Sequence, residues 1–264
     1  MNIKENFLVI AHSLRTDHVP HWLHPATMEA MHKPCLYANI YESHIFDIGN
    51  SRTQLVKMAL KFPETTHILF VDDDIIIPDP KSLDKMFNFL EINNQYIVSG
   101  LYYNKNPPNW PIIFDLTTRN GKMVFQVPYY GKEPPKDIVR EVSAVPLGFC
   151  LIKREVFESI KEPWFIFNDP ELDSKFTHNE GDPIIIGEDI YLSVKAKDAG
   201  YRMWVDCRID LLHYVPHFVG RPELVSSYKG KGLVRSQNDN YQRVRKELDE
   251  LKAQHVRTNT VSKT

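Results

Sequence analysis

The first hundred residues alternate between short apolar runs and longer segments with a helical spacing of apolar side chains. Four runs have the length of a buried strand: NFLVIA, PCLYANIY, HILFVD and QYIVSG. Two segments between them carry an apolar face at helical spacing: GNSRTQLVKMALKFP and DPKSLDKMFNFLEINN. Asn50 or Ser51 is expected to cap the first of these helices. Alternating strands and helices predict an α/β fold in which helices cover the faces of a parallel sheet.

The second half of the chain has a different pattern. Asn120-Gly121 lies between two β-rich runs and predicts a tight hairpin. Further strands are predicted within DIVREVSAVPLGFCLIK and YRMWVDCRIDLLHYV. Residues 161–187 show little regular pattern before a predicted helix that ends at Gly200. Such a connection is long for a structureless loop, which indicates a functional or mobile segment.

Composition and charge exclude several classes of protein. Of the 264 residues, 42% are hydrophobic and 25% are charged, and the net charge of −2 does not indicate a nucleic-acid-binding chain. No apolar run reaches the roughly 18 residues of a membrane span, and the opening MNIKENFLVI predicts a strand rather than a signal peptide. Cys35, Cys150 and Cys207 have no paired spacing, so we expect a reducing, cytoplasmic compartment. We expect one domain over residues 1–220 and a tail over residues 221–264.

Three consecutive aspartates follow the third apolar run, in the sequence HILFVDDDIIIPDP. Close carboxylates repel one another, so Asp72, Asp73 and Asp74 require a positive partner. Ile76 and Ile77 exclude an EF-hand, and no Gly-Lys pair precedes Ser or Thr as a phosphate-binding loop requires. Ligands of open α/β sheets bind at the carboxyl ends of strands. The pattern therefore predicts a hard cation held by Asp72 and Asp74, and the alternative is a solvated acidic turn.

The other polar clusters each allow two interpretations of their role. Glu188 and Asp189 open the predicted helix GEDIYLSVKAKDAG, where they either complement its dipole or belong to a site. His213 follows the last strand and is either a ligand or a loop histidine. The segment HVPHWLH, within residues 12–32, favours a histidine-rich binding loop over a zinc site, whose ligands need a different spacing.

In this order and approximate spacing, the motifs resemble those of GT-A-fold glycosyltransferases, and of glycosyltransferase family 2 in particular. The resemblance runs from about residue 5 to residue 217 and is carried by GNSRTQLVKMAL, ILFVDDDIIIPDP with its Asp-x-Asp motif, VPLGFCLIKREVFESI, EPWFIF and GEDIYLSVKAKDAGYRMWVDCRIDLLHY. It implies a GT-A (Rossmann-like) fold, with a mostly parallel mixed sheet flanked by helices in a single domain. The tail lacks the Gln-x-x-Arg-Trp motif, so the chain does not resemble a processive polysaccharide synthase.

The resemblance implies metal-dependent transfer of a sugar from a nucleotide-diphosphate sugar to an acceptor hydroxyl, with Mn²⁺ or Mg²⁺ as cofactor. The implied metal ligands are Asp72, Asp74 and His213. The implied donor-binding residues are Asn50, Arg52, Asp72, Asp73 and Gly148. Trp164 either stacks on an acceptor ring or belongs to the core. Asp189 is predicted to be the general base of an inverting transfer, kept ionised by the helix dipole, and Glu188 is predicted to hold the acceptor or the loop.

Alternative functions also fit a carboxylate cluster at a sheet edge. One is a nucleotidyltransferase or a metal-dependent phosphohydrolase acting on a nucleotide-sugar. Another is a non-catalytic carbohydrate-binding domain, which the complete set of Asp and His residues argues against. The acceptor is expected to be a carbohydrate or glycoconjugate, and only the tail suggests a nucleic acid, because residues 221–264 hold ten Lys and Arg against five Asp and Glu. The tail residues Lys229, Lys231 and Arg235 are predicted to close over the donor diphosphate.

Overall fold

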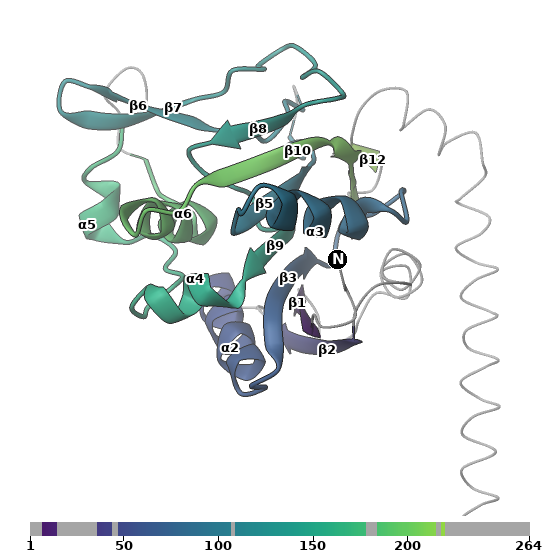
Figure 1. Cartoon of the computed structure of the whole chain (residues 1–264). Helices are drawn as coiled ribbons and strands as arrows, with labels where there is room; N and C mark the ends of the chain where they lie inside the picture. Colours follow the sequence, from purple (N-terminus) through teal and green to yellow (C-terminus); the bar gives the residue numbers. More distant parts are fainter. Residues whose placement is uncertain are drawn as a thin grey trace, which may run out of the picture.

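The computed structural model describes residues 7–14, 36–43, 47–106, 109–177, 184–214 and 218–219 (Figure 1). Its strands are β1 (Phe7–Leu14), β2 (Leu36–Ser43), β3 (Thr65–Asp72), β4 (Ile75–Ile76), β5 (Ile97–Leu101), β6 (Asp115–Arg119), β7 (Lys122–Gln126), β8 (Val139–Val142), β9 (Phe149–Lys153), β10 (Met203–Asp210), β11 (Leu212–Tyr214) and β12 (Phe218–Val219). Its helices are α2 (Ile48–Leu60), α3 (Ser82–Ile92), α4 (Arg154–Ser159), α5 (Pro170–Asp173) and α6 (Glu188–Asp198).

A seven-stranded mixed sheet in the order β2-β1-β3-β9-β5-β10-β8 forms the centre of the molecule. The strand β1 pairs in parallel with β2 and β3, and β10 pairs in parallel with β5. The strand β9 lies antiparallel between β3 and β5, and β8 lies antiparallel at the edge beside β10. The predicted α/β fold with a mostly parallel mixed sheet in one domain is thus confirmed. The insertion of β9 between two strands of the first hundred residues was not predicted.

Helices cover both faces of this sheet. Alternate side chains of β3 face opposite sides, so Ile68 and Phe70 belong to one hydrophobic cluster and Leu69 and Val71 to the other. The first cluster includes apolar side chains from α2, α4 and α6, and the second includes those from α3. A sheet with two buried faces explains why the sequence runs ILFV without a polar interruption.

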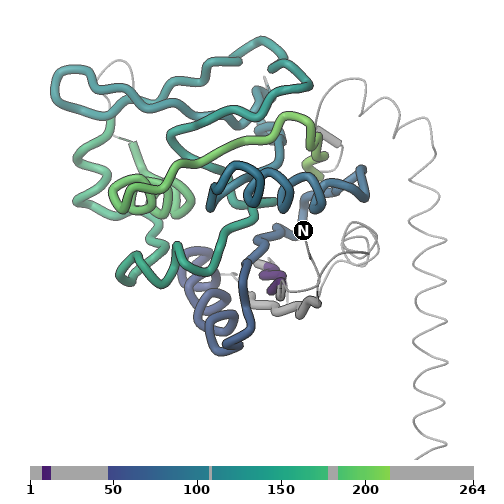
Figure 2. The backbone as a smooth tube through the Cα atoms, in the orientation of Figure 1, coloured from purple at the N-terminus to yellow at the C-terminus, as the bar shows by residue number. Residues whose placement is uncertain are grey.

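The predicted hairpin is confirmed as β6 and β7. Asn120 and Gly121 have φ angles of 51° and 74°, which the tight turn between these strands requires. Phe125 of the hairpin stacks on Phe176, and Met123 bridges to Phe176 through the backbone. Figure 2 shows the hairpin extending along the segment that holds α5 and α6. Residues 161–177, where the sequence showed little pattern, contain one regular element, the short helix α5.

The ends of helices α2 and α6 can be compared with the ends that the sequence predicted. Helix α2 is capped by Asp47, whose Oδ1 accepts from the Asn50 N–H at 3.1 Å, so the prediction of Asn50 or Ser51 as the N-cap is wrong. The helix ends at Leu60, so Phe62 lies beyond it and is exposed, although the predicted helical segment included it. Gly200 has a φ of 89° just after α6, as predicted for the end of that helix. Among the described residues, no helix combines the length and hydropathy needed to cross a bilayer.

A smaller sheet brings the end of the described chain to the aspartates. Strand β11 pairs antiparallel with β4, so His213 lies opposite Ile75, and β12 pairs with the other side of β11. The Tyr214 N–H donates to the carbonyl of Asp74 at 2.7 Å. Residues that are far apart in the sequence therefore meet at the carboxyl end of β3.

Candidate functional site

The three aspartates occupy the turn between β3 and β4. Asp72 is the last residue of β3, and its N–H donates to the carbonyl of Gly148 at 2.9 Å. The Asp72 side chain is 23% exposed, whereas the residues Asp73 and Asp74 are 7% and 5% exposed. Two of these three residues are therefore more deeply buried than a solvated acidic turn would allow.

Arg52 of α2 neutralises Asp72 from inside the protein. Its Nη2 lies 2.7 Å from Asp72 Oδ1, and its Nη1 contacts Glu188 Oε1 at the start of α6. The Arg52 side chain is only 3% exposed. Burial lowers the pKa of Arg52, but Asp72 and Glu188 outweigh burial and raise this pKa above its ordinary value. A permanently charged guanidinium thus joins the aspartate turn to the Glu-Asp helix.

Asp189 has an unusual protonation equilibrium. Burial, followed by the neighbouring charge of Glu188, raises the pKa of Asp189 to about 7, while Arg52 and the Ile190 N–H oppose this shift. The Asp189 Oδ1 accepts from that N–H at 2.8 Å. The expectation that the helix dipole keeps Asp189 fully ionised is wrong at neutral pH, because burial and Glu188 outweigh the dipole. A carboxylate that titrates near pH 7 suits proton transfer.

Asp74 has a different set of neighbours. Lys105 Nζ contacts Asp74 Oδ2, and His213 Nε2 lies 3.4 Å from the same oxygen. On the far side of its ring, His213 Nδ1 lies 2.8 Å from the carbonyl oxygen of Tyr103. A carbonyl only accepts hydrogen bonds, so Nδ1 carries a proton, and Nε2, which faces Asp74, is the nitrogen that could bind a cation when it carries no proton.

This pair fits a divalent cation. A carbonyl that orients the imidazole and leaves Nε2 as a donor of electrons is the usual arrangement behind a metal-binding histidine. Asp74 and His213 are brought together, but the Asp72 carboxylate faces Arg52 instead. Within the described residues there is no group of three or more His, Cys, Asp or Glu side chains placed to hold a metal. Two protein ligands would leave the other positions to substrate phosphates and water, as Mg²⁺ commonly requires.

Tyr102 lies between these two groups of charges. Its hydroxyl accepts from the Gly148 N–H at 3.0 Å, and its ring meets that of His213 edge-on at 5.3 Å. Burial first, and then the charges of Asp72 and Asp189, raise the pKa of Tyr102 well above its ordinary value. A Cβ at Gly148 would approach the Tyr102 hydroxyl to 2.8 Å. The absence of a side chain at Gly148 thus makes room for Tyr102, and the donor-binding role that the resemblance implies for Gly148 stays a prediction.

Asn50 and Trp164, two other predicted residues, have side-chain hydrogen bonds to partners outside the carboxylate cluster. Asn50 is exposed in the first turn of α2, where its side-chain oxygen accepts weakly from Gln54 at 3.4 Å. Trp164 is 4% exposed, and its Nε1 donates to the carbonyl oxygens of Phe157 and Ile160. Trp164 therefore belongs to the core, and the alternative role of stacking on an acceptor ring is wrong.

Sequence reasoning missed Tyr102 and Lys105. Both follow β5, in the segment GLYYNK, and β5 points in the same direction as β3. Residues that follow such strands gather at one edge of the sheet, which is the signal that was available. Lys229, Lys231 and Arg235, the rest of the tail and the histidine-rich segment 15–32 lie outside the described residues.

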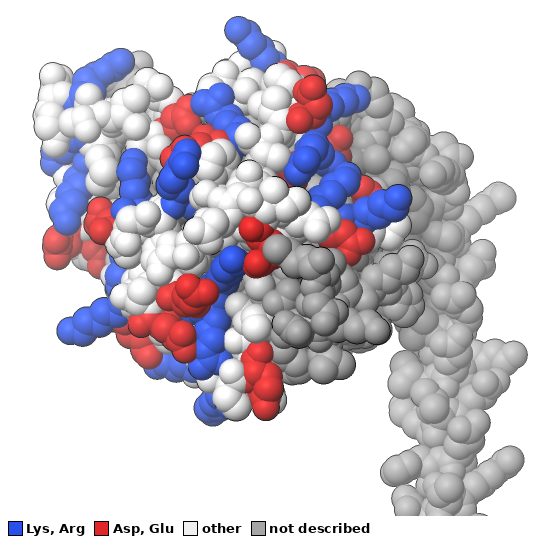
Figure 3. Space-filling model, viewed as in Figure 1, with Lys and Arg blue, Asp and Glu red and all other residues white. Residues whose placement is uncertain are grey.

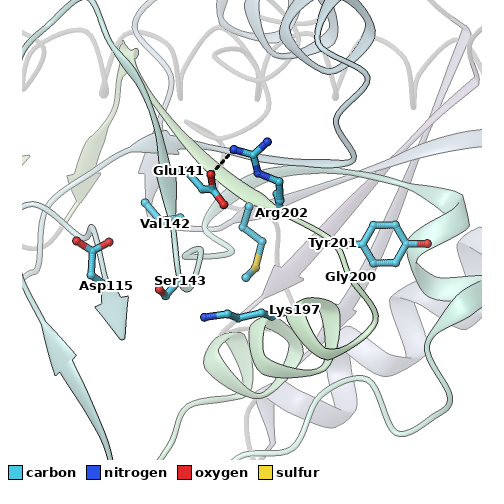
Figure 4. Close-up of a pocket in the computed structure, with 9 residues that line it drawn as sticks. Asp115, Glu141, Val142, Ser143, Lys197, Gly200, Tyr201 and Arg202 are labelled. Atoms are coloured by element: carbon cyan, nitrogen blue, oxygen red, sulfur yellow. Dashed lines mark hydrogen bonds and ion pairs between the residues drawn. The ribbon is translucent and has the colours of Figure 1, made fainter. Parts of the chain in front are cut away.

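A separate pocket of about 380 Å³ lies at the other end of the strands (Figure 4). It is lined by Asp115, Glu141, Val142, Ser143, Lys197, Gly200, Tyr201, Arg202 and Met203. Met203 pairs with Ile97, the first residue of β5, so the pocket is remote from the carboxyl edge. Arg202 contacts Glu141 across it, and Asp115 pairs with Arg140 at 2.5 Å. Its mixed, paired charges do not select a ligand of either sign.

The face of the described residues drawn in Figure 3 shows no cationic track. On the face shown in Figure 3, the Lys and Arg side chains of the described residues alternate with Asp and Glu. A protein that binds nucleic acid usually gathers its positive charges in a patch or stripe. The visible face of the described part therefore does not favour a nucleic-acid acceptor.

Comparisons with known proteins give a structural likeness only. No protein-family model matches the sequence, and no curated protein matches it either. The crystal structure of A197 from STIV has a TM-score of 0.52 and 18% identity, over 80% of this chain and 86% of that one. The likeness to A197 concerns the α/β fold alone.

A second solved structure is less similar. The crystal structure of S. aureus TarS has a TM-score of 0.43 and 13% identity, over 76% of this chain. The chain spans about a third of the length of TarS, since the match covers 35% of it. This likeness is too weak to support an argument about either fold or activity.

Proposed function

We propose that this protein is a glycosyltransferase of the GT-A class that transfers a sugar from a nucleotide-diphosphate sugar to an acceptor hydroxyl, with inversion. The observation that carries the proposal is the meeting of Asp72 with Glu188 through Arg52, close to Asp74 and His213. These residues come from three distant segments that resemble glycosyltransferase motifs. They converge at the carboxyl edge of β3, which is where a ligand of such a sheet binds.

In this proposal, Asp74 and His213 hold Mn²⁺ or Mg²⁺. The bound ion would act as a Lewis acid toward the diphosphate leaving group. Asp72 is fixed by Arg52 at 2.7 Å, and its partly exposed carboxylate would accept a hydrogen bond from a ribose hydroxyl. Arg52 itself acts as a positioning residue, because it is buried and holds both Asp72 and Glu188 in place.

Asp189 is the proposed general base. An acceptor hydroxyl is a weak nucleophile until a carboxylate takes its proton during attack. The pKa of Asp189, raised to about 7 by burial and Glu188, makes it a stronger base than an ordinary aspartate. One base on the side opposite the leaving diphosphate gives inversion at the anomeric carbon. We infer that the acceptor is a carbohydrate or glycoconjugate.

A nucleotidyltransferase or phosphohydrolase is the alternative, and product analysis separates them. The protein would be incubated with a panel of sugar nucleotides, Mn²⁺ and candidate acceptors. Release of nucleoside diphosphate with a new glycoside supports the transferase, whereas pyrophosphate indicates nucleotidyl transfer and a nucleoside monophosphate with sugar phosphate indicates hydrolysis. NMR of the product's anomeric proton tests inversion. A thermal-shift screen identifies the donor first, because a ligand that binds only the folded state raises the melting temperature.

A further inference from the structure

Lys105 holds the place next to Asp74 that a divalent ion would need. Its ammonium group contacts Asp74 Oδ2, the oxygen that also lies 3.4 Å from His213 Nε2. The Lys105 side chain is 29% exposed and the Asp74 side chain is 7% exposed, so the pair lies at the edge of the protein interior. The ammonium group of Lys105 and the imidazole of His213 therefore converge on one carboxylate oxygen.

The backbone around Lys105 is held firmly while its side chain is flexible. Asn109 Nδ2 donates to the carbonyl oxygens of Asn104 and Lys105 at 2.9 Å and 3.0 Å. The Asn104 side chain accepts from the Asn106 N–H at 2.8 Å. A fixed backbone with four flexible methylene groups lets the ammonium group swing between nearby anions without a change in fold.

Electrostatics prevents Lys105 and a divalent ion from sharing Asp74. The ammonium group already balances this carboxylate, and a second cation at the same oxygen would place three positive charges beside one negative charge. A divalent ion that uses Asp74 and His213 must therefore displace Lys105. The displaced ammonium group would then lie close to the phosphates that complete the ion's coordination, and lysine is a common partner of phosphate.

We propose that Lys105 is an exchangeable counter-ion, which occupies Asp74 in the free protein and moves to the donor diphosphate when a divalent ion binds. The proposal rests on the proposed function, because it assumes a diphosphate ligand. The proposal assigns Lys105 two opposite effects. Lys105 competes with the bare metal ion for Asp74, and it supports binding of the metal–diphosphate complex.

Two binding measurements on Lys105→Ala test this exchange. The first follows binding of Mn²⁺ alone through the electron paramagnetic resonance signal of the free ion. Removing the competing charge is expected to tighten this binding about tenfold. The second measures binding of magnesium pyrophosphate by calorimetry, and the loss of the ammonium group is expected to weaken it about tenfold.

Lys85→Ala is the matched control. Lys85 pairs with Asp79 at 2.7 Å and is 32% exposed, so this variant removes the same charge from a similar ion pair elsewhere. It should change both affinities by less than about twofold. Equal effects of the two variants, changes of the same sign in the two measurements, or no Mn²⁺ binding by either wild type or Lys105→Ala would overturn the exchange.

Sugar transfer measured separately distinguishes the two proposals. If transfer persists in the presence of a chelator while the opposite changes are missing, the role of Lys105 is lost but the transferase remains. If the opposite changes are found but no sugar nucleotide gives a new glycoside, the transferase proposal is lost. In that case, Lys105 still exchanges between Asp74 and the diphosphate at a site that binds metal and diphosphate.

Discussion

Asp72 and Asp74 lie two positions apart in the same turn, yet the protein balances their charges in different ways. Asp72 faces a guanidinium group that is 3% exposed and shared with Glu188. Asp74 faces the ammonium group of Lys105, which is 29% exposed. The Arg52 guanidinium is buried within the fold, whereas the Lys105 ammonium group lies at the surface of the site.

The difference separates a structural charge from an exchangeable one. An arginine fork binds two carboxylates at once and stays protonated, so Arg52 cannot leave without exposing two buried anions. A lysine on a flexible stem contacts Asp74 and is partly exposed to solvent. The repulsion that the sequence predicts among three aspartates is therefore already relieved by the protein, before any metal ion binds.

The largest effect on stability is expected when the buried cation, Arg52, is replaced. Arg52→Leu leaves Asp72 and Glu188 without their shared partner and should lower the free energy of unfolding by about 3–5 kcal/mol. Urea denaturation at pH 7 measures this change. Lys57→Ala is the control, because Lys57 forms an exposed pair with Glu162 at 2.8 Å and should cost about 0–1 kcal/mol. Equal losses in the two variants would contradict a structural role for Arg52.

The next largest effect concerns Asp189. Asp189→Asn keeps the shape of the side chain and its acceptor for the Ile190 N–H, but it cannot take a proton. Turnover should fall by roughly a hundredfold or more, while donor and metal binding persist. In the wild type, kcat/KM should decrease as the pH falls below about 7, where Asp189 becomes protonated. A variant with normal turnover, or a product that retains its anomeric configuration, would point to a different base.

The same substitution at the two aspartates tests the comparison directly. Asp72→Asn weakens a buried, charge-assisted contact with Arg52 and should lower the free energy of unfolding by about 1–3 kcal/mol. Asp74→Asn should cost less than about 1 kcal/mol, since Lys105 can turn to solvent. Calorimetry should in contrast show that Asp74→Asn loses Mn²⁺ binding. The reverse order of stabilities would mean that the Asp74 pair is the structural one.

A last effect, which develops gradually with pH, concerns the stability of the fold. The pKa of Asp189 is higher in the folded protein than in the unfolded chain, so its contribution to stability is present below about pH 4 and is lost as the pH rises to about 7. Asp189→Asn does not titrate. Its free energy of unfolding relative to the wild type should therefore increase by about 2–3 kcal/mol between pH 5 and pH 8. Denaturation curves that stay parallel over this range would place Asp189 in a more polar setting.

The sequence by itself determined the elements and the edge at which the acidic residues gather. Strand and helix periodicity depend on neighbouring residues, so β1, β2, β3, α3 and β5 could be located from their apolar patterns. The Asn120-Gly121 turn was equally predictable, because its backbone angles belong to the two residues themselves. The need for a positive charge beside the aspartates also followed from the sequence alone.

Only the tertiary structure decided which groups supply that charge. Arg52 and Glu188 are 136 positions apart, and Asp74 and Lys105 are 31 apart, so no local pattern relates them. The insertion of β9 between β3 and β5 sets Gly148 beside Asp72, and the pairing of β11 with β4 carries His213 to Asp74. The raised pKa of Asp189 likewise depends on burial and on the charge next to it. Ion pairs and burial depend on distances in space, which the order of residues along the chain does not contain.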